Sequence, residues 1–327
     1  MIISDRFCPR SEKITTKNKC SERKRSYLIE NTAESGLACQ LRNERIMRRF
    51  WSIVLLCFAF ISGAEAASPS PADAIPFEYA EGLLWVKIQV SQSDRPLNFL
   101  FDTGAEISVI NADTAAALGI SGGRKIQVQG VQAITTGHWP VRLAAQAGRV
   151  VLPKKYLSLD LSRLADSCSR PLDGLLGADF IQGKIVEIDF ASHLIRFHEQ
   201  ISPAKSDIDL PLKISGKCFC VPVRINGKQQ QWVRLDTGCA TALQWVTSDP
   251  GVCTKSEKPA IGLAGLSIPQ TQTTISLGAK QFDQIPTGVH SRAIFSGEAG
   301  LMGNDLLSRF KTVTIDTKSN RVVMRPM

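Results

Sequence analysis

The chain has 327 residues, of which 43% are hydrophobic, and it carries 39 Lys and Arg against 30 Asp and Glu. The length accommodates about two domains of ordinary size, and the apolar content is that of a globular protein, which excludes wholesale disorder. Glycine and proline occur without a fixed period, so a collagen-like chain is excluded as well. The formal net charge of +9 would indicate an anionic partner only if it lay on the folded body.

The first part of the chain differs in character from the rest. Residues 1–46 are polar and basic and show no helical or strand periodicity. At residue 47 a Met-Arg-Arg triplet opens an apolar stretch, which is followed by Ala-Glu-Ala at residues 64–66. A positive start, a short apolar run and an A-x-A end are typical of a secretory signal peptide, and the run is too short for a comfortable membrane span. Residues 47–66 are therefore predicted to be a signal peptide, with an apolar core helix as the alternative interpretation.

This prediction bears on residues 1–46 and on the location of the protein. Because a signal peptide normally begins a chain, residues 1–46 are interpreted as a doubtful upstream extension, with Met47 as the start of translation. We expect the protein to be exported, either to a periplasm or as a secreted protein. Membrane association is expected only if the signal segment remains uncleaved.

Cleavage after residue 66 would change the charge and the cysteine content. Residues 1–66 hold 12 of the basic and 7 of the acidic side chains, so residues 67–327 carry 27 basic against 23 acidic ones. Clustered Lys and Arg with interleaved aromatic residues do not occur in this body, so no nucleic-acid partner is predicted. The cysteines have no zinc-site spacing, and neither a metal site nor a cofactor is predicted. An oxidising compartment would allow up to two disulfides, with the pairing left open, among Cys168, Cys218, Cys220, Cys239 and Cys253.

The predicted elements of residues 67–198 begin with a linker. Residues 67–80 start with a stretch rich in Ser, Pro and Ala and are interpreted as this linker, which leads into a first lobe at residues 81–198. In the lobe, the alternation of Val86–Val90 predicts a strand with one buried face. A short helix is expected at Ala112–Leu118 and a hairpin turning at Ala191–His193.

The second half of the body follows the same plan. Residues 199–212 are mostly polar, contain two prolines and are predicted to be an inter-lobe linker. Residues 213–327 form the second lobe, in which short apolar runs are again separated by turn-forming residues. A short helix is expected at Asp305–Phe310, and a hairpin turning at Lys318–Asn320. The body is therefore expected to be mainly β.

The two halves repeat one another in sequence. NFLFDTGAEISVI, around Asp102, matches QWVRLDTGCATAL, around Asp236. DGLLGADFI at residues 173–181 matches AGLMGNDLL at 299–307, and hairpin segments with similar patterns follow both. The matching blocks occur in the same order, so the sequence indicates an internal duplication that brings two Asp-Thr-Gly triplets to equivalent places.

The paired triplets favour a carboxylate dyad. A single Asp-Thr-Gly could simply form a turn, and this remains the alternative interpretation. Two aspartates held close together share one proton over a working pH range, so the pair can act as both base and acid on a bound water and a peptide carbonyl. Gly104 and Gly238 would let the loops approach closely because they lack a Cβ, and Thr103 and Thr237 could bond across to the opposite loop.

At these residues the chain resembles the aspartic peptidases of the retroviral and pepsin clan. The resemblance rests on the Asp102 and Asp236 triplets and on the two later hydrophobic-hydrophobic-Gly blocks, which end at Gly177 and Gly303. It implies a mainly β fold, with two retropepsin-like β-barrel lobes in a pepsin-like bilobal arrangement. It also implies catalytic roles for both aspartates, supporting roles for Gly177 and Gly303, and a monomer with an internal pseudo-two-fold axis.

The chain departs from the pepsin pattern after each triplet. Pepsin-type members carry Ser or Thr there, whereas this chain has Ala105 and Cys239, which favours activity at milder acidity. We interpret Cys239 as a small buried residue, with a regulatory thiol as the alternative. A closing hairpin, or flap, is expected at Gln127–Val141 in the first lobe, with its tip near residues 135–139, and at Ile261–Thr273 in the second.

The sequence thus predicts an exported aspartic endopeptidase whose water nucleophile is activated by Asp102 and Asp236 at the lobe interface. Its partner would be a polypeptide substrate bound in an extended conformation. The alternative is a non-catalytic peptide-binding groove of the same fold. The natural substrate and the residues preferred at the cut are left open by the sequence.

Overall fold

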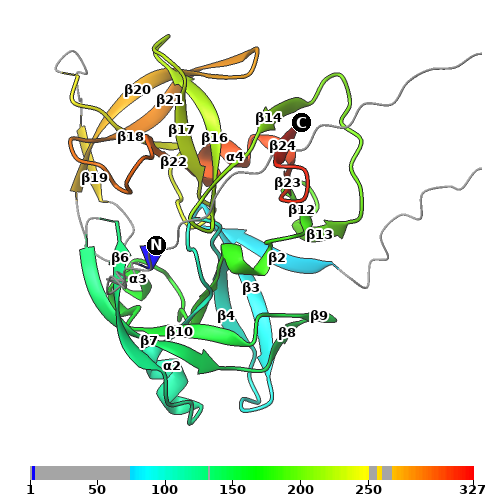
Figure 1. The fold of residues 1–327 in the computed structure, drawn as a ribbon, viewed down its shortest axis with the longest axis vertical. Coiled ribbons are helices and arrows are strands. Elements are labelled where there is room, and N and C mark those ends of the chain that lie inside the picture. Colours follow the sequence, from blue (N-terminus) through cyan, green and yellow to red (C-terminus); the bar gives the residue numbers. More distant parts are fainter. Residues whose placement is uncertain (1, 4–73, 132, 250–255, 260–266) are drawn as a thin grey trace, which may run out of the picture. The chain divides into compact units, whose positions relative to one another are not determined.

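The structure is a computed structural model that describes residues 2–3, 74–131, 133–249, 256–259 and 267–327 (Figure 1). All of these belong to one compact unit, which comprises Met1–Arg6 and Pro69–Met327. The predicted signal peptide, residues 47–66, lies outside the described residues. So does the predicted extension, residues 1–46, except for strand β1 (Ile2–Ile3), which pairs antiparallel with β6.

The first lobe is built from short strands, as its alternating apolar residues predict. Within it β11 lies between two partners, parallel to β4 and antiparallel to β5. Strand β10 pairs with β5 on one side and with β7 on the other. The elements are β3 (Leu83–Val90), β4 (Leu97–Phe101), β5 (Val109–Asn111), α2 (Ala112–Ala117), β6 (Arg124–Gly130), β7 (Ala133–Arg142), β8 (Ala145–Ala147), β9 (Val150–Val151), β10 (Lys155–Leu159), α3 (Ser162–Ala165), β11 (Gly174–Leu176) and η3 (Ala178–Phe180).

The second lobe repeats this arrangement in the same register. Strand β22 lies parallel to β17 and antiparallel to β18, and β21 pairs parallel with β18. Leu175 faces Leu100 in the first lobe, and Leu301 faces Arg234 at the equivalent place in the second. The elements are β15 (Lys213–Ser215), β16 (Cys218–Ile225), β17 (Gln231–Leu235), β18 (Leu243–Val246), β19 (Ser256–Pro259), β20 (Ser267–Leu277), β21 (Lys280–His290), β22 (Gly300–Met302) and α4 (Asn304–Leu307).

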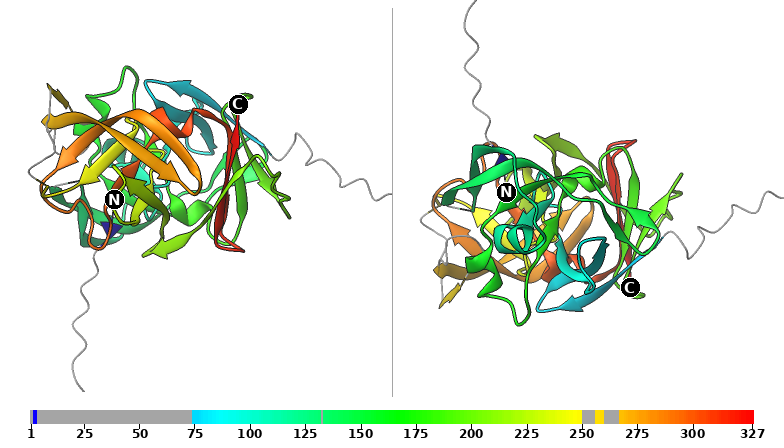
Figure 2. Two further views of the ribbon diagram at one scale, coloured as in Figure 1. Left: turned by 90° about the horizontal axis from the view of Figure 1, so that it is seen from above. Right: turned by 90° about the horizontal axis from the view of Figure 1, so that it is seen from below.

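A third set of strands joins the lobes, and Figure 2 shows the β23–β24 hairpin in red beside the green β12–β13 hairpin. Glu187 pairs with Thr314 and Ile188 pairs with Val313. The register between β12 and β23 is therefore the same when it is followed from either half, as a two-fold axis requires. The order is β2 (Ile75–Ala80), β13 (Leu194–His198), β12 (Ile185–Asp189), β23 (Phe310–Asp316), β24 (Arg321–Pro326) and β14 (Ile208–Pro211). The predicted mainly β, two-lobed fold is confirmed.

The two linker predictions need correction. Residues 67–80 contain strand β2, and residues 199–212 contain strand β14. Both strands are short, and each begins by alternating buried and exposed positions. Strand β2 lies between β3 and β13, whereas β14 pairs with β24 at the end of the strand order. Ile75 and Phe77 are buried in β2, and Ile208 and Leu210 are buried in β14. These alternating apolar residues, rather than the neighbouring prolines, decide the local structure.

The predicted helices and hairpins are found close to their expected places, at α2, α4 and the β12–β13 and β23–β24 turns. In the first lobe the expected flap, Gln127–Val141, falls on the β6–β7 hairpin. The expectation that the tip lies near residues 135–139 is wrong. Gly130 pairs with Ala133, so residues 135–139 lie along β7. The second expected flap, Ile261–Thr273, lies partly outside the described residues, and its remainder belongs to β20.

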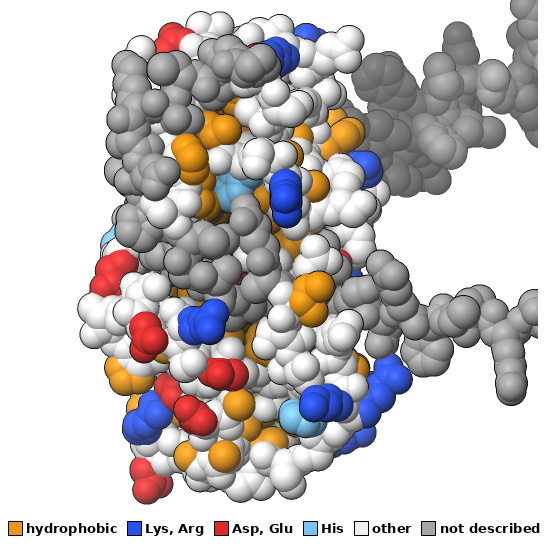
Figure 3. Space-filling view, turned by 90° about the vertical axis from the view of Figure 1, so that its left-hand side faces the viewer, with side chains coloured by type: hydrophobic (Ala, Val, Ile, Leu, Met, Phe, Trp, Pro, Cys, Tyr) orange, Lys and Arg blue, Asp and Glu red, His pale blue; other side chains and the backbone are white. Residues whose placement is uncertain are grey.

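One apolar core runs through both lobes and the joining sheet, and a separate one lies inside the first lobe. No helix among the described residues is long and apolar enough to cross a membrane. On the face drawn in Figure 3, Lys and Arg side chains are interspersed with Asp and Glu in the lower half of the view.

Candidate active site

The two Asp-Thr-Gly loops face one another across the lobe interface. A Cβ atom on Gly104 would lie 2.6 Å from Asp236 Oδ2, and a Cβ on Gly238 would lie 2.5 Å from Asp102 Oδ1. Real Cβ atoms do not approach other atoms so closely, so only glycine fits at either position. Each glycine therefore packs against the carboxylate of the opposite loop, and the structure brings the two predicted aspartates together.

The threonines of the two triplets bind the loops to each other. Thr103 N–H donates to Thr237 Oγ1 at 3.0 Å, and Thr237 N–H donates to Thr103 Oγ1 at 3.2 Å. Each hydroxyl in turn donates to the opposite strand, Thr103 to Leu235 O at 2.9 Å and Thr237 to Phe101 O at 2.6 Å. All of these groups are buried, so the reciprocal bonds fix the distance and register of the two loops.

Each aspartate is also anchored within its own lobe. The N–H of Asp102 donates to Leu176 O at 2.9 Å, and the N–H of Asp236 donates to Met302 O at 2.9 Å. The Oδ1 atom of Asp102 accepts the N–H of Gly104 at 2.9 Å, and Oδ1 of Asp236 accepts the N–H of Gly238 at 2.9 Å. The ends of β11 and β22 thus hold the backbone, while the loop amides orient the carboxylates.

The two later glycines lie directly beneath the loops. A Cβ on Gly177 would lie 2.7 Å from the carbonyl carbon of Ile107. A Cβ on Gly303 would overlap the carbonyl oxygens of Cys239 and Thr241. The structure therefore places Gly177 and Gly303 where the resemblance expects supporting residues, in contact with the backbone that follows each triplet.

Asn304 holds the second loop to the first lobe, and the sequence analysis missed it. Its side-chain nitrogen donates to Thr237 O at 2.7 Å and to Gly82 O at 2.7 Å. The equivalent residue after the first block is Ala178, whose side chain has no donor. The sequence did carry a signal for this residue, because a polar side chain follows the glycine in only one copy of the repeat.

The two carboxyl groups have different surroundings. Asp236 is buried, with 8% of its surface exposed, whereas Asp102 is only half-buried. Burial, followed by the nearby charge of Asp102, raises the pKa of Asp236 well above that of an ordinary aspartate. The pair therefore retains a proton at a pH at which isolated aspartates are ionised, and its apparent pKa values belong to both groups together.

A buried ion pair lies beneath the loops and was also missed. The side chains of Arg234 and Glu298 are 0% and 2% exposed, and they meet through two parallel hydrogen bonds. Burial opposes the charge on Arg234, but the hydrogen bonds that Arg234 donates to Glu298 outweigh it and raise the pKa of the guanidinium. The sequence carried a signal, since Arg234 interrupts an apolar strand directly before the second triplet.

The thiol beside the second triplet is neutral. Cys239 Sγ lies 3.2 Å from Thr241 Oγ1, and burial together with the charge of Asp236 raises the pKa of the Cys239 thiol to about 12. Four of the body's cysteines, Cys168, Cys218, Cys220 and Cys239, are free thiols, and Cys253 lies outside the described residues. Within the described ranges, no cluster of three His, Cys, Asp or Glu could hold a metal ion.

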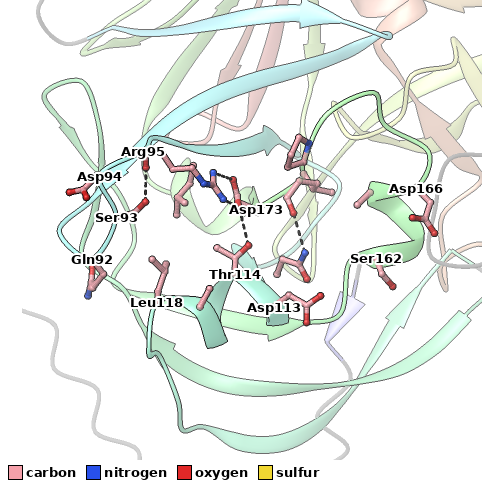
Figure 4. Close-up of a pocket in the computed structure, with 16 residues that line it drawn as sticks. Gln92, Ser93, Asp94, Arg95, Asp113, Thr114, Leu118, Ser162, Asp166 and Asp173 are labelled. Atoms are coloured by element: carbon pink, nitrogen blue, oxygen red, sulfur yellow. Dashed lines mark hydrogen bonds and ion pairs between the residues drawn. The ribbon is translucent and has the colours of Figure 1, made fainter.

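A cavity of about 710 Å³ opens on the first lobe between β4, α2 and α3 (Figure 4). Its main polar feature is Asp173, which accepts bonds from both terminal nitrogens of Arg95 and from the Thr114 hydroxyl. None of the predicted site residues lines this cavity. The cavity is therefore separate from the paired triplets.

Comparison with known proteins agrees with this geometry. Residues 86–180, which include Asp102, match a family model described as aspartyl protease. The crystal structure of the aspartic proteinase from Irpex lacteus superimposes with a TM-score of 0.50 at 12% sequence identity, covering 78% of this chain and 97% of that one. No curated protein matches the chain.

The first lobe is thus similar in sequence to the aspartyl protease family, and the fold of the chain is similar to that of an aspartic proteinase. The resemblance to aspartic peptidases inferred from the motifs is confirmed. The family match ends before the second triplet, so the pairing of Asp236 with Asp102 rests on the geometry of this chain.

Proposed function

We propose that the protein is an aspartic endopeptidase that hydrolyses peptide bonds at the interface between its lobes. The observation that carries the proposal is the approach of the two triplets, in which each glycine leaves room only for the opposite aspartate. The reciprocal threonine bonds support it, because they hold both carboxylates in fixed register. A pair of ordinary turns would require neither feature.

In this mechanism the two carboxyl groups share one proton. The ionised member accepts a proton from a water bound between them, and the water oxygen attacks the peptide carbonyl. The protonated member donates a hydrogen bond to the carbonyl oxygen as negative charge develops there, and the pair then delivers a proton to the leaving amine. The buried position and raised pKa of Asp236 favour it as the protonated member at the start of the cycle.

The substrate would be a polypeptide held in an extended conformation. An extended segment can satisfy its backbone groups against the strands and loops that border the triplets, while pockets select side chains. The β6–β7 hairpin is the first-lobe candidate for a closing flap, and its Ile134 is 74% exposed, as expected of a side chain that meets an apolar partner on closure.

Export and a monomeric state complete the proposal. The signal-like pattern of residues 47–66 supports export to a periplasm or to the medium. The internal two-fold arrangement supports a monomer, because one chain supplies both aspartates. The proposed chemistry draws on these two carboxylates and a water, and it requires no cofactor.

A cleavage assay on denatured protein substrates tests the mechanism. Wild type is compared with Asp102→Asn and Asp236→Asn, with Asp283→Asn as a matched control because Asp283 is an exposed aspartate on β21. We expect both dyad variants to lose at least about 1,000-fold in kcat, and the control to retain wild-type activity. Cleavage that survives either dyad substitution would exclude the mechanism, and peptide binding without any cleavage would favour a non-catalytic groove.

A further inference from the structure

The two lobes differ in what lies beneath their catalytic loops. In the first lobe β3 pairs Trp85 with Leu100, and in the second β16 pairs Cys220 with Arg234. The same register makes Glu298 the equivalent of Leu172, because each stands five residues before the glycine of its block. The floor of the first lobe is thus a buried apolar cluster that contains Trp85, Leu100 and Leu172, whereas the floor of the second is polar.

The polar floor is organised around Arg234. Its Nε donates to Glu298 Oε2 at 2.6 Å, and its Nη2 donates to Glu298 Oε1 at 2.5 Å. The ring of Phe295 lies 3.9 Å from the guanidinium carbon. The guanidinium is therefore held in one orientation by a bidentate carboxylate and an aromatic face.

The third nitrogen of Arg234, Nη1, donates both to the opposite lobe and to Cys218 Sγ at 3.2 Å. Nη1 donates to Gly104 O at 2.9 Å, and the thiol of Cys218 contacts the same oxygen at 3.3 Å. The N–H of Gly104 donates to Asp102 Oδ1, and a Cβ at Gly104 would touch the carboxyl group of Asp236. Arg234 is thus one hydrogen bond away from a residue that contacts both aspartates.

The ion pair is also oriented. Glu298 occupies the edge of the guanidinium formed by Nε and Nη2, so the positive end of the pair faces the loop and the negative end lies behind it. Burying such a pair costs desolvation free energy, and apolar replacements of similar volume are often as stable. The first lobe has such an apolar floor, so folding of the repeat does not require the charges.

We propose that Arg234 is a positioning residue of the aspartate pair: through Gly104 it fixes the first loop, and its oriented charge keeps the pair singly ionised at lower pH. Glu298 holds Arg234 in place and sets the direction of its field. The second lobe thereby controls the geometry and charge of the aspartate contributed by the first. The catalytic part of this inference rests on the proposed peptidase function, whereas the effect on the charge of the pair does not.

The test copies the apolar floor into the second lobe. The double variant Arg234→Leu/Glu298→Leu is compared with wild type, with Glu298→Gln and with Leu100→Met, which disturbs the apolar floor without changing any charge. The titration of the pair is followed by NMR of ¹³C-labelled aspartate carboxyls, assigned with Asp102→Asn and Asp236→Asn. This readout needs no substrate, so it remains informative if the peptidase proposal fails.

We expect the pair to titrate about one pH unit higher in the double variant, because the facing positive charge is gone. Glu298→Gln should move the titration downward, because it leaves that charge uncompensated, and Leu100→Met should leave it unchanged. Where cleavage is measurable, kcat of the double variant should fall about tenfold with little change in KM. Shifts of the same sign in the double variant and in Glu298→Gln, or no shift in the folded double variant, would overturn the proposal. If the double variant does not fold, Glu298→Gln alone decides the sign.

Discussion

Each lobe places a carboxylate just before its hydrophobic-hydrophobic-Gly block, but the two carboxylates have different partners. In the first lobe it is Asp173, which is itself buried and accepts hydrogen bonds from the exposed Arg95 and from Thr114 at the cavity of Figure 4. In the second lobe it is Glu298, which faces inward to Arg234 beneath the loops. The two positions differ by one residue in the repeat. The charge therefore stands at neighbouring positions of the repeat and meets a different partner in each lobe.

The difference shows that the same backbone arrangement accommodates two different sets of side chains beneath the loops. The first lobe keeps its loop on an apolar floor and has its charged contact near the surface. The second lobe has an ion pair in place of that floor, and it also supplies Asn304, which bonds across to the first lobe. The backbone pairing of β4 with β11 and of β17 with β22 is the same in both. The buried polar groups that bond to the opposite lobe from beneath the loops therefore come from the second lobe.

The largest expected effect comes from breaking the buried ion pair on one side only. Arg234→Leu leaves the Glu298 carboxylate buried without its partner, and we expect a loss of roughly 3–5 kcal/mol in the free energy of unfolding. Leu100→Met, at the equivalent place in the first lobe, should cost less than about 1.5 kcal/mol because it conserves volume. Urea unfolding at neutral pH measures both. Similar losses in the two variants would mean that the floors do not differ in the proposed way.

Much of this asymmetry lies beyond what the sequence could predict. The duplication predicted the paired triplets, their supporting glycines and the two-lobed fold, because these depend on short motifs repeated in order. The partners Arg234 and Glu298 are 64 residues apart, and only the tertiary structure brings them together. Strands β2 and β14 were missed because each is short and contains a proline, so that the local composition masked their alternation. The flap tip depended on hairpin register, which composition does not fix.

The hydrogen bonds between Thr103 and Thr237 are the same in both directions, whereas the residues beneath the two loops differ. Thr103→Val and Thr237→Val each keep the shape of the side chain but leave a buried N–H and a buried carbonyl without partners. We expect each variant to lose roughly 2–4 kcal/mol of stability, together with most of its activity, because the register of the loops is set by these bonds. Equal losses in thermal unfolding would show that the loop contact itself is two-fold. A loss confined to one variant would place the asymmetry in the loops as well as the floor.

We expect the Asp173 carboxylate of the first lobe to make the free energy of unfolding depend on pH in the acid range. Burial alone would raise the pKa of Asp173, but hydrogen bonds from Arg95, Asn98 N–H and Thr114 outweigh it and hold the pKa below the ordinary value. A carboxylate with a lowered pKa contributes stability above its unfolded-state pKa, and this contribution is lost as the pH falls. Asp173→Asn should therefore cost roughly 1–3 kcal/mol at pH 7 and much less at pH 3. Thermal unfolding at the two pH values measures this difference, and a cost that does not change with pH would contradict the assignment.

Asp236 should show the opposite dependence, since its pKa is raised by burial and by Asp102. A carboxyl group with a raised pKa favours the folded state fully only while it is protonated in both states. That contribution is lost as the pH rises from the ordinary aspartate range through the folded-state value. Replacing the buried carboxyl with the neutral Asp236→Asn amide should therefore stabilise the protein by roughly 1–2 kcal/mol at pH 8, with a smaller difference at pH 4. If Asp236→Asn is instead less stable than wild type at pH 8, then Asp236 is not the member of the pair on which the cost of burying charge falls.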